Sequence, residues 1–275
     1  MPEGDTVFKL AGYLRPHLSG RQLVVGKVRG SPDAVLAGVC IGDVYARGKH
    51  LFIELDQSRL LRSHLGMRGS WHGYAPGEPW QKPLRQASIV LDTGERIFVC
   101  FNALQVEILR NGGVRRRTFD VTLGPDLLVG SLDIETILRR ARELADPGMP
   151  VADVLLNQRI ASGIGNVYKS EVLFLETCHP ATPLARVADA HLVHLYRQAS
   201  RLLRRNRQGG PRITRWANDD AGRLWVYGRT GQQCLRCGCV IRSSKLGVRG
   251  RSTFWCPRCQ PGLGSTVLTD QTDGY

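Results

Sequence analysis

The chain has 275 residues, 42% of them apolar, which is enough for two or three modest domains with ordinary hydrophobic cores. Its 38 basic residues exceed its 24 acidic residues and give a net charge of +14, so we expect a polyanionic partner, most often nucleic acid. The sequence contains no apolar run long enough for a transmembrane helix and no signal-peptide core, so we expect no membrane-spanning helix and a cytoplasmic location. In that reducing compartment we expect the eight cysteines to be metal ligands or core residues rather than disulfides.

The first residues combine a nucleophile with a carboxyl group. Removal of Met1 would leave Pro2 with a secondary amine, which can attack an aldehydic carbon and form an iminium ion. Glu3 beside it can move protons. The alternative is an ordinary helix start, because proline and acidic residues are both frequent in a first helical turn. Taken alone the opening favours the helix start, and the rest of the chain reverses that preference.

Residues 5–18 have the periodicity of an amphipathic helix that ends before Gly20. The face expected to be buried carries Val7, Leu10, Leu14 and Leu18. From residue 22 to about residue 109 the pattern changes to short β-rich runs separated by turn-forming residues. Examples are Leu23–Val28, Leu51–Leu55, Ser88–Leu91 and Arg96–Phe101. Their regular spacing predicts a β-sandwich or a barrel.

The segment Asn111–Val129 is rich in glycine and arginine and has no periodicity, so we expect a linker to a second domain. Helical patterns follow it at Leu132–Leu144, Val151–Leu156, Asn166–Glu176 and Asp189–Arg204. A last unit, from Gly228 to Gln260, contains four paired cysteines, and residues 261–275 have the composition of a disordered tail.

The paired cysteines have the spacing of a metal site. Cys234 and Cys237 form one CxxC pair, and Cys256 and Cys259 form the second, so that two tight turns can supply four thiolates. A closed four-sulfur site leaves no position for water, so we expect one structural Zn²⁺ per chain rather than a catalytic metal. Alternating residues between the pairs predict a β-hairpin ribbon. Cys239 is an alternative ligand, but it breaks the turn geometry.

The remaining residues of this hairpin are strongly basic. The basic side chains between the cysteine pairs are Arg242, Lys245, Arg249 and Arg251. Such a run is often only a solvated face, but on a hairpin in a protein of this net charge it favours contact with nucleic acid. The isolated cysteines Cys40, Cys100 and Cys178 are expected in the core.

The segment Asn157–Glu171 carries a second motif. Gly163 and Gly165 permit a tight turn, and Asn166 is expected to follow as the N-cap of a helix. Backbone N–H groups at such a turn form a good phosphate site. The alternative is an ordinary corner between two helices.

Four features occur together in one order along the chain. They are the Met-Pro-Glu-Gly start, Arg47-Gly48-Lys49 before an apolar strand, the Gly-Ile-Gly-Asn turn that ends at Asn166, and the cysteine ribbon with Arg251 shortly before Cys256. In this combination the chain resembles the formamidopyrimidine-DNA glycosylase/endonuclease VIII family of base-excision-repair enzymes. The resemblance implies an α+β fold, in which an N-terminal β-sandwich with flanking helices precedes a helix–two-turns–helix domain and a zinc-ribbon hairpin. The corresponding ranges are 1–115 for the catalytic sandwich, 116–130 for a linker, 131–227 for the helical domain, 228–260 for the zinc finger and 261–275 for the tail.

The resemblance also implies a bifunctional DNA glycosylase/AP lyase that acts on double-stranded DNA containing a damaged base or an abasic site. We further expect a monomer without a membrane partner. Pro2 would be the Schiff-base nucleophile, and Glu3 the proton donor and shuttle. Lys49 would contact the phosphate at the lesion and assist β-elimination. Asn166 would hold the same backbone, and Arg251 would do so from the hairpin and assist δ-elimination.

A damaged base must leave the stack before it is excised, and an inserted side chain can fill the gap. Met67, which ends the run His64-Leu-Gly-Met67, is either this DNA-contacting wedge or a core residue beneath a β-turn.

The class of lesion is harder to predict. The oxidised-purine branch of the family carries an Asp-Pro-Arg-x-Phe-Gly stretch, but the corresponding place, Asn102–Glu107, contains neither that arginine nor that phenylalanine. Asp5 and the Glu107-Ile-Leu run look more like the endonuclease VIII branch, so we expect oxidised pyrimidines. The His64–Met67 run looks like the purine branch. An oxidised-purine glycosylase is therefore one alternative, and a non-catalytic zinc-ribbon protein that binds damaged DNA is another.

Overall fold

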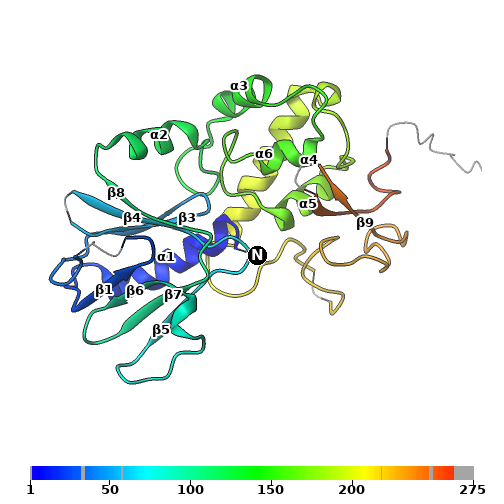
Figure 1. Ribbon diagram of the computed structural model, residues 1–275. Helices are drawn as coiled ribbons and strands as arrows, with labels where there is room; N and C mark the ends of the chain where they lie inside the picture. Colours follow the sequence, from blue (N-terminus) through cyan, green and yellow to red (C-terminus); the bar gives the residue numbers. More distant parts are fainter. Residues whose placement is uncertain (1, 32–34, 57, 218, 248–249, 263–275) are drawn as a thin grey trace, which may run out of the picture. The chain divides into compact units, whose positions relative to one another are not determined.

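The structure, a computed structural model, describes residues 2–31, 35–56, 58–217, 219–247 and 250–262 (Figure 1). The chain forms two compact units that are not continuous in sequence. The first contains Met1–Asp133, Ala161–Gly165 and Leu203–Gly210, and the second contains Ile134–Ile160, Asn166–Leu202 and Pro211–Tyr275. Among the described residues, no helix has both the length and the apolar character needed to span a bilayer.

The first unit begins with helix α1, Gly4–Leu18, at the place where the sequence predicts a helix. Val7, Leu14 and Leu18 are buried as predicted, and Leu10 is half-buried. The helix begins after Glu3, so Pro2 lies outside it rather than in its first turn. Gly20, at a positive φ of 76°, follows the end of the helix.

Two four-stranded antiparallel sheets complete this unit, and they confirm the predicted β-sandwich. One sheet has the order β1-β6-β7-β5 and the other has the order β2-β3-β4-β8 (Figure 1). The strands are β1 (Val25–Val28), β2 (Val44–Arg47), β3 (His50–Glu54), β4 (Arg59–His64), β5 (Ser70–Tyr74), β6 (Ala87–Asp92), β7 (Ile97–Phe101) and β8 (Gln105–Arg110), with a short 3-10 helix η1 (Leu84–Gln86) before β6. Apolar residues of both sheets and of α1 form one core, so α1 is packed against the sheets.

The segment predicted to be an irregular linker contains a helix. Helix α2 occupies Val114–Thr122, and every one of its residues is at least partly exposed, which explains why no hydrophobic periodicity reveals it. Its stability comes instead from an i,i+4 ion pair between Arg116 and Asp120 and from Phe119, which packs on the outer face of β3 against Phe52. The domain limits expected from the sequence stay predictions.

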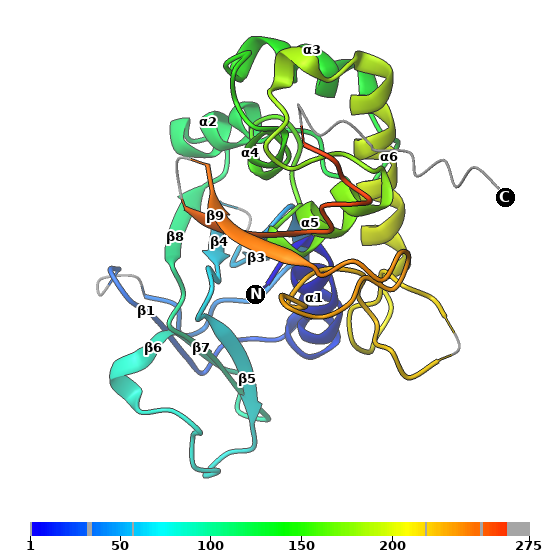
Figure 2. The same ribbon diagram turned by 90° about the vertical axis from the view of Figure 1, so that its right-hand side faces the viewer.

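The second unit is mainly helical. Its elements are α3 (Ile134–Leu144), α4 (Val151–Leu156), α5 (Asn166–Leu175), η2 (Leu184–Arg186), α6 (Asp189–Arg205), whose last residues belong to the first unit, and the antiparallel pair β9 (Arg242–Leu246) and β10 (Arg251–Trp255). The four predicted helices of this part are confirmed, with ends that differ by up to two residues. The predicted hairpin is confirmed by the pairing of Arg251 with Leu246 and of Trp255 with Arg242 (Figure 2).

Three expectations concern residues at the margins of the structure. Met1, Arg249 and all of the predicted tail after residue 262 lie outside the described residues.

Cys100 and Cys178 are buried as predicted. The prediction for Cys40 is wrong, because this thiol is exposed at an isolated bridge to Gln22, where the chain pairs with a loop rather than a strand.

Candidate active site and metal centre

The N-terminal segment is docked by its backbone onto the Gly163–Gly165 turn. The N–H of Gly4 donates to the carbonyl oxygen of Gly163 at 2.9 Å. A Cβ on Gly4 would lie 2.5 Å from the Leu128 side chain and 3.0 Å from the Cα of Gly163, so only glycine permits this approach. The result is a fixed position for the half-buried Pro2, which directly precedes Glu3.

Glu3 is fully buried, and the N–H of Gly165 donates to its Oε2 atom at 2.6 Å. A Cβ on Gly165 would lie 2.4 Å from the carboxyl carbon, so this glycine makes room for the acid. The expectation of an open phosphate site at this turn needs a correction, because one of its backbone donors already binds a carboxylate from the distant N-terminus. This hydrogen bond fixes the carboxyl group beside Pro2.

Lys49 lies in the two-residue turn between β2 and β3, where Arg47 pairs with His50. Gly48 has a positive φ of 57°, and a Cβ there would lie 2.8 Å from the Cβ of Ser162. Ser162 directly precedes the turn that binds Gly4 and Glu3. The four-residue segment 162–165 therefore contacts both the N-terminal segment and the turn that carries Lys49, and brings these two parts of the predicted site together.

Two histidines border Lys49. The rings of His50 and His64 have centroids 4.8 Å apart, and the N–H of Gly66 donates to Nδ1 of His64 at 3.1 Å. Burial is the main cause that lowers the pKa of His50 to about 3 and that of His64 to about 4, and the charge of Lys49 acts in the same direction. Both imidazoles are neutral near pH 7. The sequence motif His64–Met67 contains one of these histidines, but the sequence alone assigned it no role.

Asn166 is the first residue of α5 rather than the N-cap before it, and it is buried. The same helix carries Glu171, which is also fully buried. Its carboxylate accepts hydrogen bonds from the Thr214 hydroxyl and from backbone N–H groups of the segment 225–227. Burial raises the pKa of Glu171, and these bonds oppose the rise. Sequence reasoning missed this role, because the donors lie far along the chain.

Helix α5 also holds the strand that begins with Arg251. Lys169 is almost fully buried, and its Nζ atom donates to the carbonyl oxygen of Ser252 at 3.1 Å and to the hydroxyl of Thr253 at 2.7 Å. The N–H of Phe254 donates to the Ser170 hydroxyl at 3.4 Å. Two predicted phosphate-binding residues, Asn166 and Arg251, thus belong to two elements that are bonded to each other. Arg251 itself is half-buried.

Met67 lies in the turn between β4 and β5, and the residue is 66% exposed. The core interpretation of this residue is therefore wrong. Large exposed apolar side chains at a turn are suited to insertion into a stack of bases, so the wedge stays a prediction.

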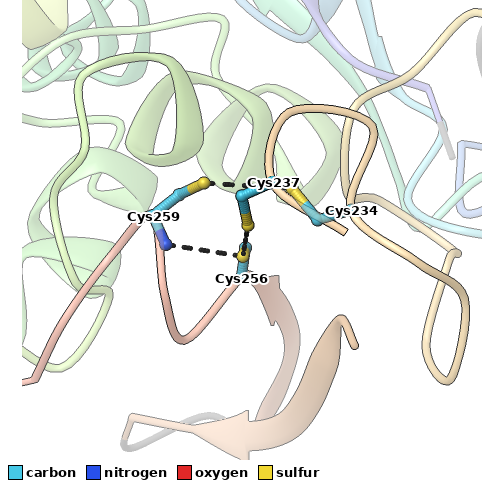
Figure 3. A group of neighbouring side chains, drawn as sticks. All are labelled: Cys234, Cys237, Cys256 and Cys259. Carbon is cyan, nitrogen blue, oxygen red and sulfur yellow. Dashed lines mark hydrogen bonds between the residues drawn. The ribbon is translucent and has the colours of Figure 1, made fainter. Parts of the chain in front are cut away.

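The four paired cysteines converge on one point (Figure 3). Their sulfur atoms lie within 4.8 Å of one another, with Cys237 and Cys256 3.5 Å apart and Cys234 and Cys259 3.9 Å apart. Tetrahedral coordination with metal–sulfur bonds of about 2.3 Å requires sulfur separations of this size. The cluster therefore fits a metal ion, and within the described part of the chain Cys239 does not belong to it.

Two family descriptions match the chain. The formamidopyrimidine-DNA glycosylase N-terminal domain matches residues 1–104, and the formamidopyrimidine-DNA glycosylase H2TH domain matches residues 123–215. The probable endonuclease 8 2 of Streptomyces coelicolor is 39% identical over 267 residues, which cover 95% of each chain. The DNA-(apurinic or apyrimidinic site) lyase Nei2 of Mycolicibacterium smegmatis is 37% identical and covers 94% of this chain and 99% of the relative. The formamidopyrimidine-DNA glycosylase of Methylococcus capsulatus is 30% identical, with 94% and 100% covered.

The fold has close counterparts among solved structures. A Lactococcus lactis formamidopyrimidine-DNA glycosylase bound to DNA with an abasic site matches with a TM-score of 0.79 and 23% identity, over 94% of this chain and 100% of that chain. At this identity the match shows the fold.

Proposed function

The chain belongs to the formamidopyrimidine-DNA glycosylase/endonuclease VIII family, and on that premise we propose that this DNA glycosylase/AP lyase of base excision repair removes oxidised pyrimidines through the amine of Pro2. The observation that carries the proposal is the docking of the N-terminal segment onto residues 163–165. This docking fixes Pro2 beside the buried carboxyl group of Glu3. Gly4 and Gly165 make it possible, because a Cβ at either position would collide with neighbouring atoms.

The reaction begins when the damaged nucleotide leaves the duplex, at a cost of a few kcal/mol. The neutral amine of Pro2 attacks C1′ of the sugar as the bond to the base breaks, and Glu3 moves a proton to open the sugar ring. The product is an iminium ion on C1′, which draws electrons and acidifies the 2′ proton. Loss of that proton expels the 3′ phosphate, and a second elimination expels the 5′ phosphate.

Basic and amide side chains hold the DNA backbone during these steps. Lys49 would contact the phosphate at the lesion, and its neutral histidine neighbours add no competing charge. Asn166 would bind the same strand, and Arg251 would bind it from the hairpin and assist the second elimination. Met67 would fill the gap left by the extruded base. We expect a monomer acting in the cytoplasm, at the nucleoid if the protein is bacterial.

The metal in this proposal is one zinc ion with a structural role. Cys234, Cys237, Cys256 and Cys259 would hold it, and when bound it would fasten the hairpin that carries Arg251. A four-thiolate set leaves no coordination position for water, so we assign no reacting atom to the metal.

Covalent trapping tests the nucleophile. Borohydride should reduce the iminium and link the enzyme to a duplex with an abasic site. Pro2→Gly keeps an N-terminal amine and should retain part of the trapping, whereas a chain with Met1 retained should lose it. Equal trapping by the chain with Met1 in place would refute Pro2 as the nucleophile, whereas no trapping by the processed chain would favour a non-catalytic DNA-binding protein.

A panel of duplexes tests the lesion class. The relatives named endonuclease 8 are 37–39% identical, against 30–32% for the relatives named formamidopyrimidine-DNA glycosylase, which supports pyrimidine lesions. The His64–Met67 run supports the purine alternative. Excision of thymine glycol should be faster than excision of 8-oxoguanine opposite cytosine, and the reverse order would establish the alternative.

A further inference from the structure

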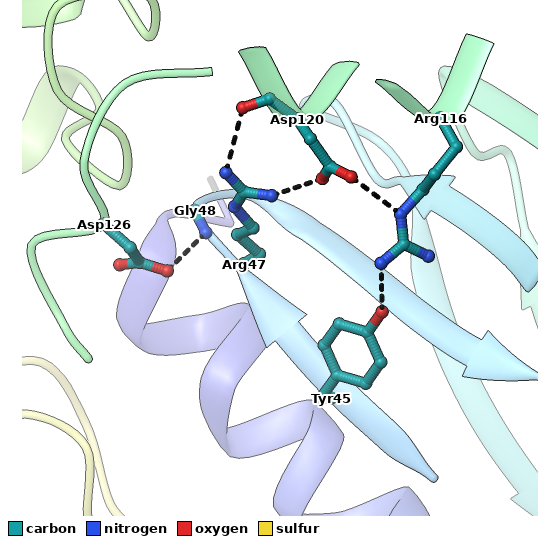
Figure 4. Close-up of polar contacts among 6 residues, drawn as sticks. All are labelled: Tyr45, Arg47, Gly48, Arg116, Asp120 and Asp126. Carbon is teal, nitrogen blue, oxygen red and sulfur yellow. Dashed lines mark hydrogen bonds and ion pairs between the residues drawn. The ribbon is translucent and has the colours of Figure 1, made fainter. Parts of the chain in front are cut away.

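The turn that carries Lys49 is hydrogen-bonded, through Arg47 beside it, to helix α2, which the sequence does not predict. The side-chain carboxylate of Asp120, on α2, accepts a hydrogen bond from Nη1 of Arg47, the last residue of β2 (Figure 4). The backbone carbonyl oxygen of the same aspartate accepts from Nη2 of Arg47 at 3.2 Å. Two donors of one guanidinium thus bind one residue, and this fork fixes direction as well as distance.

Asp120 is itself fixed by its neighbours on α2. Nε of Arg116 donates to the second carboxylate oxygen of Asp120 at 3.0 Å, and Nη2 of Arg116 donates to the hydroxyl of Tyr45 on β2 at 3.3 Å (Figure 4). The ring of Phe119 packs edge-on against His50, with centroids 4.9 Å apart. The helix is therefore attached to β2 and β3, the two strands that the turn connects.

A second carboxylate binds the turn from its other side. Oδ2 of Asp126 accepts from the N–H of Gly48 at 2.8 Å, and Oδ1 accepts from the N–H of Leu128 at 2.9 Å. Arg47 and Gly48 are thus both bonded to the segment 114–128, and Lys49 is the next residue. A lysine places a point charge at the end of a flexible stem, so the position of its backbone sets where the charge can reach.

We propose that Asp120 is a positioning residue for Lys49, which sets the turn so that the ammonium group meets the phosphate at the lesion. The inference rests on the function proposed above. The Arg47–Asp120 pair has side chains 34% and 38% exposed, and a pair this exposed contributes little to stability. Its doubly bonded geometry instead serves placement, and placement errors of about 1 Å can cost large factors in rate.

A double-mutant cycle tests this role. Single-turnover cleavage of an abasic-site duplex is measured for the unmodified enzyme, Asp120→Asn, Lys49→Ala and the double variant. Asp120→Asn should slow β-elimination about tenfold in the presence of Lys49. In the Lys49→Ala background it should cause no further loss, because the group that it positions is gone. A residue that only stabilised the fold would lower the rate by the same factor in both backgrounds.

The matched control is Asp43→Asn, which removes an Asp–Arg pair with Arg15 just before the other end of β2. It should cleave at the unmodified rate, and Asp120→Glu should recover part of the lost activity. An unchanged rate for Asp120→Asn, or a large fall in its melting temperature, would overturn the inference. Failure of the unmodified enzyme to cleave or to be trapped would instead overturn the proposed function, so the two failures are distinguishable.

Discussion

Lys49 and Arg251, the two basic residues proposed to contact DNA, each belong to a β-hairpin, and the two hairpins are held by different interactions. The β2–β3 turn, with Lys49, belongs to a four-stranded sheet with a hydrophobic core behind it, and carboxylates bind its backbone and its arginine. The β9–β10 hairpin, with Arg251, is a two-stranded sheet. An isolated pair of strands is marginal in water, and the apolar cluster against which Phe254 packs is small, so a cysteine cluster and a buried lysine add to it. The comparison shows that the interactions holding each hairpin differ with the size of the hydrophobic core beside it. Hydrogen bonds to carboxylates suffice next to the large core, whereas the hairpin with the smaller core also has a cysteine cluster and a buried lysine.

Loss of the metal site should have the largest effect. Cys256→Ala removes one ligand, and structural zinc contributes on the order of 10 kcal/mol to the folding of small zinc units. We expect zinc loss, an unfolded hairpin and no δ-elimination product, while the first unit keeps borohydride trapping by Pro2. Zinc content by mass spectrometry and gel analysis of the products check this. Cys239→Ala should keep its zinc, and a Cys256→Ala protein with full zinc and δ-product would contradict the assignment.

Both turns use a glycine at a close approach, which allows a matched test. Gly247 has a φ of 75°, and a Cβ there would lie 1.9 Å from a carboxylate oxygen of Asp153 on α4. Gly48 has the corresponding contact with Ser162. Alanine at either position should cost about 3 kcal/mol from strain and collision together. Gly247→Ala should reduce only δ-elimination, and Gly48→Ala should reduce β-elimination.

The control for strain alone is Gly77→Ala, because Gly77 also has a positive φ but would place its Cβ in open space. It should lose less stability in urea unfolding than either of the other two variants. Equal losses in all three would show that collision at the two turns has no part in their placement.

The buried amine of Lys169 should contribute less than the metal to the second hairpin. Lys169→Met keeps most of the volume but leaves the carbonyl oxygen of Ser252 and the hydroxyl of Thr253 without this donor. We expect a loss of about 2 kcal/mol in urea unfolding. Lys245→Met, at an exposed position of β9, should change stability little. A Lys169→Met protein as stable as the unmodified one would show that this amine does not help to hold the hairpin.

Acidification should lower the free energy of unfolding through the two histidines beside the Lys49 turn. The pKa values of His50 and His64, about 3 and about 4 in the folded chain, lie below the ordinary value of 6.5. Between those limits the unfolded chain binds more protons, so stability is complete above pH 6.5 and falls as the pH decreases. From pH 7 to pH 5 we expect a loss of about 1 kcal/mol for each imidazole, after allowing for partial exposure. The His50→Gln protein should lose less stability than the unmodified protein between pH 7 and pH 5. An identical pH dependence of unfolding would refute the lowered pKa of His50.

Local patterns were sufficient for much of the fold. The periodicity of residues 5–18 and of Val151–Leu156 predicts helices that the structure contains, because each buries one apolar face. The two CxxC pairs predict a four-cysteine cluster, because the spacing itself creates the turns. Helix α2 was not predicted, because it buries no apolar stripe and depends on hydrogen bonds to β2 and on a ring contact with His50 of β3. Cys40 was misplaced, because residue type alone does not reveal exposure.

The sequence by itself determined the family, the order of the elements apart from α2, and the identities of the proposed reacting groups, because these depend on residue types and short spacings. Only the tertiary structure decided that Glu3 occupies the space left open by Gly165, that Lys169 binds the strand of Arg251 and that Asp120 grips the turn of Lys49. Each of these contacts joins residues more than 70 positions apart. Such contacts form only when packing brings distant segments together, and no local pattern encodes them.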